Sequence, residues 1–430
     1  MHLNDAYRNI FPAKKQGESM PESLSTTPQP YWSALGATLY LGDVRECLRR
    51  LPARSVHCAV TSPPYWGLRS YLDKDHSDKS YEIGSEPSPD CGTSGQAQCG
   101  TCYVCAMVGV FRDVYRVLRD DGTLFLNLGD TYASGGKSDS RDDWDSAIVG
   151  TDNAYGRKRT MNCGDFNVKS GVSSGNLVGI PWRVALALQA DGWVLRQDII
   201  WAKPSPMPES VTNRCTKSHE YMFMFTKGMR YYYDAVAIEE PTVVSTSPTK
   251  NKRDVWTVAA KSYHGAHFAT YPPLLITPCI LAGTSECGCC ASCSTPYERI
   301  TTVDRAESRV SGGGNGFGSR DPSAPEAGAQ QTANWAEPVG KRTVGWRKVC
   351  GCQTDDVVPA VVLDPFVGSG TTVATSVQLG RVGIGIDLSE AYLQDHAIPH
   401  IEAAISSEKV VRESTVVVPP DVPPTPRRLR

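Results

Sequence analysis

The sequence predicts an α/β fold built around a mixed β-sheet. Short runs rich in β-branched and aromatic residues are followed by glycine, proline or aspartate, which is typical of strands that end at a loop. Segments between these runs carry apolar residues at helical spacing. In one place a strand, a glycine turn and a helix follow one another directly, as in sheets that hold a nucleotide at the carboxyl ends of their strands. At 430 residues the chain can bury a substantial core.

The expected elements follow from these patterns in chain order. Strands are expected at 37–41, 56–60, 123–128, 193–201, 361–363 and 382–386. Helices are expected at 44–51, 108–118, 182–190 and 371–379. Asp121-Gly122 is expected to stop the second helix, because glycine after aspartate is a common break signal. Residues 219–226 and 229–233 are expected to form a β-hairpin around Lys227-Gly228.

The stretch Thr61-Ser62-Pro63-Pro64-Tyr65-Trp66 follows the strand expected at 56–60. Two consecutive prolines hold this backbone extended, so its carbonyl groups cannot fold back into a helix. Carbonyl acceptors beside a tyrosine ring suit a flat ligand that bears an exocyclic amine. A proline-rich turn that merely ends a core strand is the alternative interpretation.

A second stretch, 361–372, reads Val-Val-Leu-Asp-Pro-Phe-Val-Gly-Ser-Gly-Thr-Thr. Its glycine turn lets the backbone approach a ligand closely, and Asp387, an acid about twenty residues on, can hold ribose hydroxyls. A phosphate-cradling loop is not expected, because the Gly-Lys-Ser/Thr ending is absent. Asp364 is a poor neighbour for phosphate and a good partner for an ammonium group. A ribose and a cationic amino-acid end are both present in S-adenosylmethionine, which we expect as the cofactor.

In this order, the two stretches resemble the β group of the amino-methylating DNA methyltransferases of bacteria and phages. The resemblance covers residues 37–76, 108–130, 178–234, 264–286 and 361–402. It implies a Rossmann-like, S-adenosylmethionine-dependent methyltransferase fold, circularly permuted so that the cofactor motif stands near the C-terminus. It places the acid at position 43 near the cofactor's adenine and the 267–272 segment along the cofactor pocket. The expected cofactor-binding residues are Asp43, Thr270, Asp364, Phe366, Gly368, Ser369, Gly370, Thr371, Thr372 and Asp387.

The resemblance also suggests a mechanism for the proline-rich loop. An exocyclic amine is a poor nucleophile because its lone pair is delocalised into the ring, and a site that accepts both N–H hydrogens helps it attack a methyl group. We assign these acceptors to the Ser62 hydroxyl and to a main-chain carbonyl of the loop, and we expect Tyr65, alone or with Trp66, to stack on the base. The base must be flipped out of double-stranded DNA to reach such a site. The expected catalytic residues are Ser62, Pro63, Pro64 and Tyr65.

Fifteen cysteines are present, and eight of them stand at metal-ligand spacing. The first set is Cys91, Cys99, Cys102 and Cys105, and the second is Cys290, Cys293, Cys350 and Cys352. Each set can close a tetrahedral zinc site, and four thiolates leave no open position for a water, so both sites are expected to be structural. Thiols without metal are the alternative for each set. Cys287 and Cys289 also compete with Cys290 for a place among the ligands.

The predicted organisation is one large domain with two insertions. Residues 1–30 are expected to be a disordered arm, 31–411 the methyltransferase domain and 412–430 a proline-rich tail. Within the domain, we expect a catalytic half, a cofactor half in two pieces and two insertions for zinc binding or DNA recognition. These parts are 37–234 for the catalytic half, 264–286 and 361–402 for the cofactor half, and 85–106 and 287–352 for the zinc-knuckle insertions.

The net charge and the hydropathy of the sequence limit how the protein can bind DNA or a membrane. A net charge of −2 argues against a general polyanion binder, so a DNA-binding surface should be local. No apolar run reaches the length of a membrane span, and the N-terminus lacks the apolar core of a signal peptide. We therefore expect a cytoplasmic protein of a bacterial host cell. A homodimer and a cognate restriction enzyme both stay open as partners.

The choice of base depends on Ser62. In the resembling family, aspartate or asparagine before Pro-Pro-Tyr is usual for adenine-N6 enzymes and serine is typical of cytosine-N4 enzymes, so cytosine N4 is favoured. The chemistry alone admits both bases, because a hydroxyl can accept from the amine and donate to the neighbouring ring nitrogen. Two further alternatives are an inactive DNA-binding module of the same fold and a methyltransferase that acts on RNA or on a protein amide.

Overall fold

A computed structural model describes most of the chain between residues 29 and 407. The described ranges are 29–67, 72, 75–86, 88–89, 99–133, 166–167, 172–173, 175–206, 208–242, 249–260, 271–303 and 341–407. Cys91, Thr270 and the proline-rich tail lie outside these ranges, as does nearly all of the expected N-terminal arm. Within the described ranges, no helix is both long and apolar enough to cross a membrane.

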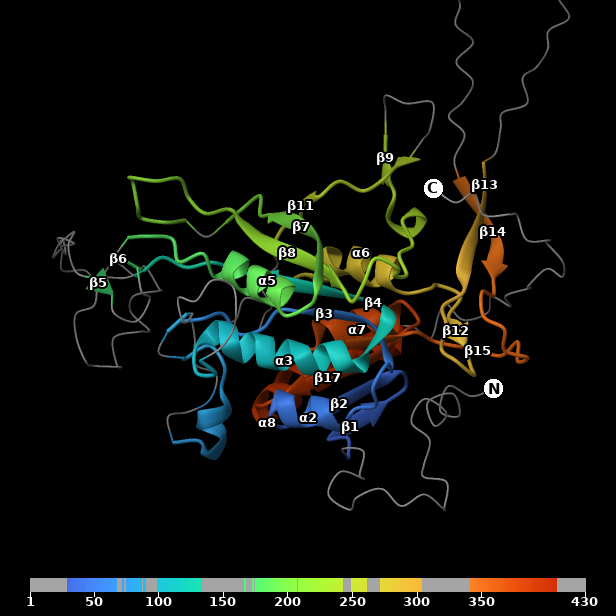
Figure 1. Cartoon of the computed structure of the whole chain (residues 1–430), viewed down its shortest axis with the longest axis horizontal. Coiled ribbons are helices and arrows are strands. Elements are labelled where there is room, and N and C mark those ends of the chain that lie inside the picture. Colours follow the sequence, from blue (N-terminus) through green and yellow to red (C-terminus); the bar gives the residue numbers. More distant parts are fainter. Residues whose placement is uncertain are drawn as a thin grey trace, which may run out of the picture.

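A nine-stranded sheet forms the centre of the molecule, in the order β1-β2-β17-β16-β3-β4-β8-β7-β11 (Figure 1). Strands β2, β17, β16, β3 and β4 run parallel to one another. Strand β1 is antiparallel to β2, β8 is antiparallel to both β4 and β7, and β11 is parallel to β7. The sheet is therefore mixed, as predicted. The bounds are β1 Trp32–Ala34, β2 Ala37–Leu41, β3 Val56–Thr61, β4 Leu118–Leu128, β7 Val194–Ala202, β8 His219–Thr226, β11 Val255–Thr257, β16 Val361–Asp364 and β17 Val382–Asp387.

The last two strands of the sequence lie in the middle of the sheet. β17 pairs with β2, with Gly385 opposite Leu39, and β16 pairs with β3, with Val362 opposite Cys58. Strands β2 and β3, which are close in sequence, are thus separated in the sheet by two strands from the other end of the described chain.

Helices cover both faces of this sheet. On one face, the apolar sides of α2, α3 and α5 join β3, β4 and β8 in one buried cluster. On the opposite face, α6 packs on β3 and β4, and α7 and α9 pack on β2. Neighbouring side chains on one strand divide between these clusters, because successive residues of a strand point to opposite faces. The bounds are α2 Val44–Arg50, α3 Tyr103–Val117, α5 Ile180–Ala190, α6 Pro273–Gly283, α7 Thr371–Gln378 and α9 Ile398–Ser407.

Shorter elements complete the described residues. Four short helical segments are η1 Ser77–Tyr81, η3 Val236–Ile238, α8 Glu390–Tyr392 and the π-turn η4 Leu393–Ala397. Four small antiparallel pairs lie outside the central sheet, among them β13–β14 to one side of it (Figure 1). Their bounds are β5 Phe166–Asn167, β6 Val172–Ser173, β9 Glu240–Pro241, β10 Thr249–Lys250, β12 Cys289–Cys290, β13 Glu298–Val303, β14 Lys341–Arg347 and β15 Val357–Val358.

The predicted break at Asp121-Gly122 is wrong. Helix α3 ends at Val117, and β4 begins at the next residue. Asp121-Gly122 lies within β4, where the pairing with β3 shifts register between Val56 and Cys58. Extra residues on one strand form a bulge, and glycine is common in bulges. The Asp-Gly pair, which predicted the end of a helix, therefore marks a bulge inside a strand.

The predicted hairpin between 219–226 and 229–233 is also wrong. Strand β8 has the expected bounds, but residues 229–233 are not in a strand. Both edges of β8 are already occupied, since Thr226 pairs with Thr123 of β4 on one side and with Val194 of β7 on the other. A strand has two edges, so β8 has no edge left for a third partner.

Candidate active site

Loops from several strands meet at one edge of the sheet. The parallel strands all place their carboxyl ends there, and β8, which runs the other way, has its first residues there, with Tyr221 opposite Leu128. The 62–65 loop follows β3 and the glycine turn 368–370 follows β16, and these two strands are direct neighbours. The two motifs therefore lie at the carboxyl ends of neighbouring strands.

Asp364 joins the two motifs beneath this edge. Its carboxylate accepts hydrogen bonds from the hydroxyls of Thr61 (2.6 Å), Tyr271 (2.8 Å) and Thr372 (2.7 Å). A fourth comes from the backbone N–H of Phe366 (3.1 Å). The residue is only 1% exposed, and burial raises the pKa of Asp364 above its usual range, although these donors oppose the rise. The carboxylate therefore ties β3, β16, α7 and the segment before α6 together.

The glycine turn is held close to the helical segment after β17. Gly370 caps α7 with a φ of 80°, a conformation that favours glycine. A Cβ atom at this position would lie 3.0 Å from the backbone of Ala397, so the close approach also requires glycine. The Ser369 carbonyl lies 2.9 Å from Nδ1 of His400, which fixes the turn from the same side.

Asp387 ends β17 beside this turn. Its carboxylate accepts from the backbone N–H groups of Gly368 and Ser389, each at 2.9 Å. Burial, together with the Asp364 carboxyl nearby, raises the pKa of Asp387 to about 6, even though the two N–H donors act in the opposite direction. The residue is half-buried, so the carboxylate is oriented by the protein without being fully enclosed by it.

Asp43 lies next to Asp387 across the sheet edge, because the Gly42 N–H donates to the Asp387 carbonyl at 2.9 Å. Asp43 caps helix α2, accepting from the backbone N–H of Arg45 at 2.8 Å, and it also pairs with the Arg45 guanidinium. Burial would raise the pKa of Asp43, but the hydrogen bonds from Arg45 lower it overall. Asp43 is thus the N-cap of α2, and its contact with the cofactor's adenine stays a prediction.

In the 62–65 loop, Tyr65 is fixed by its hydroxyl. This group donates to Glu220 at 2.7 Å, lies 3.1 Å from Oδ1 of Asn127 and accepts from the Ser62 hydroxyl at 3.3 Å. Burial and the Glu220 carboxylate raise the pKa of Tyr65 well above its usual range, so the phenol stays neutral. One edge of the ring packs on Gly129, where a Cβ atom would come within 2.6 Å of it.

Pro63, Pro64 and Trp66 of the same stretch differ in the contacts that they make. The Pro64 carbonyl accepts from the Tyr103 hydroxyl at 2.8 Å, and Pro63 is buried. In the described part of the chain, no hydrogen bond reaches the carbonyls of Ser62 and Pro63. Trp66 is 9% exposed and donates its indole N–H to the Glu86 carbonyl at 2.9 Å, so it belongs to the core.

Three polar residues around Tyr65 were not predicted as site residues. Asn127 comes from β4, Glu220 from β8, and Lys203, which pairs with Glu220, follows β7. The Asn127 amide also donates to the Tyr221 carbonyl at 3.0 Å, which fixes its orientation. A buried asparagine within the apolar run 123–128 was a signal of this role. The positions of Glu220 and Lys203 depend on how the strands pair, and the sequence near each of them does not indicate that pairing.

Two groups of thiols are close enough to share a metal ion. In each group the Sγ atoms all lie within 4.8 Å of one another. The groups are Cys290, Cys293, Cys350 and Cys352, and separately Cys99, Cys102 and Cys105. Of the competing cysteines 287, 289 and 290, all of them described, Cys290 is the one in the four-thiol group. Cys91, the predicted fourth ligand beside Cys99, Cys102 and Cys105, lies outside the described residues, as does Thr270 of the expected cofactor pocket.

Known proteins resemble this chain over much of its length. A family model described as a DNA methylase matches residues 56–291 and 358–398. The type II methyltransferase M.Cfr9I of Citrobacter freundii is 44% identical over 254 residues, which are 58% of this chain and 73% of that protein. M.SmaI of Serratia marcescens is 34% identical over 374 residues, 87% of this chain and 90% of that protein. Among solved structures, PvuII DNA methyltransferase, described as cytosine-N4-specific, aligns with a TM-score of 0.46 at 14% identity and covers 90% of both chains.

The family match contains the elements that build the edge described above. It spans β3 with the 62–65 loop, β4, β8, β16 with the glycine turn, and β17. The same two motifs carried the resemblance in the sequence. The match extends over more than half of the chain, and the chain belongs to the family of amino-methylating DNA methylases.

Proposed function

We propose that this chain transfers a methyl group from S-adenosylmethionine to the exocyclic amine of a base flipped out of duplex DNA. The observation that carries the proposal is the Thr61–Asp364 hydrogen bond, because it joins the strand end before the amine-acceptor loop to the strand end before the glycine turn. The test is methyl transfer from labelled cofactor to duplex DNA by the purified chain. Cofactor binding without transfer to any duplex would contradict the proposed activity.

The residues at the glycine turn fit an adenosyl cofactor. Asp387 presents a half-buried carboxylate oriented by two backbone N–H groups, and its remaining lone pairs can accept from ribose hydroxyls. Asp43 follows the neighbouring strand β2, directly after Gly42, whose N–H donates to the Asp387 carbonyl. When bound, S-adenosylmethionine supplies an electrophilic methyl group on a sulfonium. We assign the turn residues Phe366, Gly368, Ser369, Gly370, Thr371 and Thr372 to the wall of this pocket.

The 62–65 loop would hold the amine. The Ser62 hydroxyl, which donates to Tyr65, still has lone pairs to accept one amine hydrogen. The second acceptor is the main-chain carbonyl of Ser62 or of Pro63, since the Pro64 carbonyl is engaged by Tyr103. Tyr65 stacks on the base, with its ring fixed by Glu220 and Gly129. Positioning the amine in line with the methyl group supplies most of the rate, and no covalent intermediate with the protein is required.

We further propose that cytosine N4 is methylated rather than adenine N6. Support comes from Ser62, which is typical of cytosine enzymes in this family where adenine enzymes carry aspartate or asparagine. The expected result is N4-methylcytosine, and no N6-methyladenine, in DNA from cells that express the chain. Digestion to nucleosides and separation by mass measures both products. Methyladenine without methylcytosine would contradict the assignment while leaving the amino-methylation itself intact.

Cofactor affinity is expected to depend on the protonation of Asp387. Since the pKa of this carboxyl is raised to about 6, it is mostly ionised at pH 7 and mostly protonated at pH 5. A protonated carboxyl accepts less well from ribose hydroxyls, so the Kd should rise about tenfold between pH 7 and pH 5. Isothermal titration across this range measures the change. In the Asp387→Asn control, binding should be weaker at pH 7 and nearly independent of pH. A flat profile in the unmodified chain would contradict the ribose contact.

A further inference from the structure

The β13–β14 hairpin lacks the features that usually stabilise a strand pair. All seven residues of β14 are exposed or half-buried. The strands are joined through the whole segment 304–340, so no short turn sets their register, although Val303 pairs with Lys341. A two-stranded hairpin is marginally stable by itself in water. Other contacts must therefore hold the two strands together.

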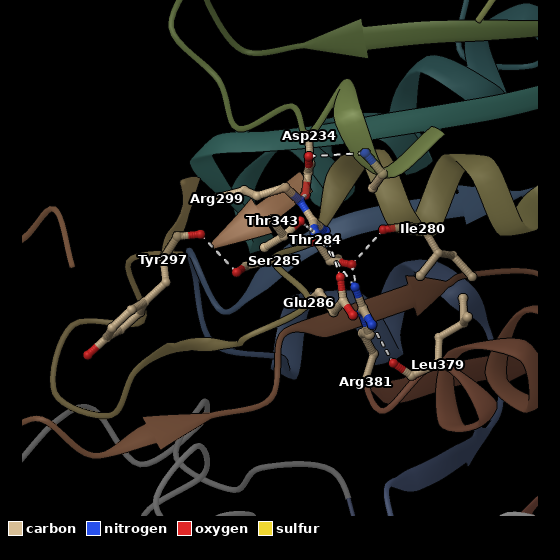
Figure 2. Close-up of polar contacts among 11 residues, drawn as sticks. Asp234, Ile280, Thr284, Ser285, Glu286, Tyr297, Arg299, Thr343, Leu379 and Arg381 are labelled. Atoms are coloured by element: carbon tan, nitrogen blue, oxygen red, sulfur yellow. Dashed lines mark hydrogen bonds and ion pairs between the residues drawn. The ribbon is translucent and has the colours of Figure 1, made fainter. Parts of the chain in front are cut away.

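One such contact is Arg299 of β13, whose side chain is 11% exposed (Figure 2). Its guanidinium donates to the carboxylates of Asp234 at 2.8 Å and Glu286 at 2.6 Å, and to the hydroxyl of Thr343 on β14 at 2.7 Å. Asp234 is itself joined to α6 through the Ala282 carbonyl at 2.9 Å. This network ties the first part of the hairpin to the central domain.

The four-thiol group lies just beyond this network, at the end of the hairpin away from 304–340. Cys290 and Cys293 precede β13 in a Cys-x-x-Cys turn, and Cys350 and Cys352 follow β14. Ser294 closes the first turn in the left-handed conformation at a φ of 57°, and its N–H donates to the Cys290 carbonyl at 2.8 Å. In a tetrahedral site with Zn–S bonds of about 2.3 Å, the sulfur atoms are about 3.8 Å apart. The observed spacing within 4.8 Å is already near that geometry.

The first cysteine turn is docked on the start of β3. The buried His57 of β3 accepts from the backbone N–H of Val361 through Nδ1 at 3.0 Å, so Nε2 carries the hydrogen and donates to the Ser294 carbonyl at 2.9 Å. Arg119 donates to the Cys293 carbonyl at 3.0 Å. These bonds connect the cysteine turn to β3 and β16, the two strands that carry the proposed catalytic and cofactor loops.

We propose that Cys290, Cys293, Cys350 and Cys352 bind one structural Zn²⁺, which closes the open hairpin and fixes its cysteine turn on β3. Four thiolates fill a tetrahedral shell, so the ion has no open position for a water and takes no part in methyl transfer. Three of the four cysteines are only partly buried, and they come from the two sides of a long insertion. The β12–β15 pair, in which Cys290 lies opposite Val357, already joins these two sides, and the ion adds a second link beside it.

Metal analysis of the full-length chain tests this proposal. Cys293→Ser and Cys350→Ser should each contain one zinc per chain less than the unmodified protein. Cys215→Ser, which changes an exposed thiol outside both groups, should retain the full content. Inductively coupled plasma mass spectrometry measures the zinc. Unchanged zinc in both ligand variants would overturn the site, and iron in place of zinc would overturn the choice of metal.

A second measurement uses the unmodified chain and therefore does not depend on any variant folding. Thiols are alkylated before and after removal of zinc by a chelator, and each cysteine is located by peptide mass spectrometry. The four proposed ligands should resist alkylation before chelation and react after it, whereas Cys215 should react in both states. Alkylation of Cys293 and Cys350 before chelation, at the rate of Cys215, would overturn the proposal.

Discussion

Replacing Asp364 by alanine is expected to lower the free energy of unfolding by about 3–5 kcal/mol. The Thr61 hydroxyl and the Phe366 N–H would lose their acceptor, and an unsatisfied buried donor costs about 1–3 kcal/mol. Tyr271 and Thr372 would also lose a bond, although they keep the one to each other. Urea denaturation followed by tryptophan fluorescence measures the difference. The exposed Asp395 provides the matched control, and its alanine variant should stay within about 0.5 kcal/mol of the unmodified chain. An Asp364→Ala variant as stable as that control would contradict this role.

The milder variant Asp364→Asn separates two ways in which this residue could act on the cofactor. If the carboxylate binds the ammonium group directly, affinity for S-adenosylmethionine falls while affinity for 5′-methylthioadenosine, which lacks the amino-acid end, is retained. If Asp364 acts by holding the glycine turn in place, both affinities fall together. The four donors that surround the carboxylate favour the second result.

Replacing Tyr65 by alanine is expected to lower kcat/KM for duplex DNA by about 100-fold. Stacking on an aromatic ring contributes about 1–3 kcal/mol per base, and misplacing the reacting amine adds a further loss. Tyr65→Phe keeps the ring and loses the bond to Glu220, so its loss should be about tenfold or less. Initial rates with labelled cofactor measure these values.

Two controls make the Tyr65 result specific. Tyr81→Ala removes an exposed tyrosine on η1 and should leave the rate unchanged. A duplex in which the target base is mispaired lowers the cost of flipping, so part of the Tyr65→Ala loss should be recovered on that substrate. A Tyr65→Ala rate within about threefold of the unmodified chain would contradict the stacking role.

Features with a local cause were predictable from the sequence. The proline pair and the glycine turn restrict their own backbones, so the positions of the 62–65 loop and the 368–370 turn at strand ends could be predicted. Asp43 could be predicted as a helix cap because the helical spacing starts at the next residue. In both cases the physical constraint acts within a few residues.

Features that depend on distant pairing were not predictable in the same way. Glu220 reaches Tyr65 because β8 runs antiparallel to β4, and no residue near 220 specifies that partner. The sequence indicated Asp364 as a partner for an ammonium group, whereas the structure surrounds it with donors that include Thr61, 303 residues away. The hairpin predicted after β8 was wrong for the same reason. Whether a strand has a free edge depends on the order of strands in the whole sheet.

The insertion of β16 and β17 between β2 and β3 has a consequence for synthesis on the ribosome. Residues 37–61 emerge long before 361–387, and at about 5–20 residues per second the delay is roughly 15–60 s. During that time β2 lacks β17 and β3 lacks β16, although β1 and β4, their neighbours on the other side, are made much earlier. A nascent chain released before residue 361 would lack the centre of the sheet and with it the acceptor that fixes Thr61. A fragment that ends before residue 361 is therefore expected to be inactive.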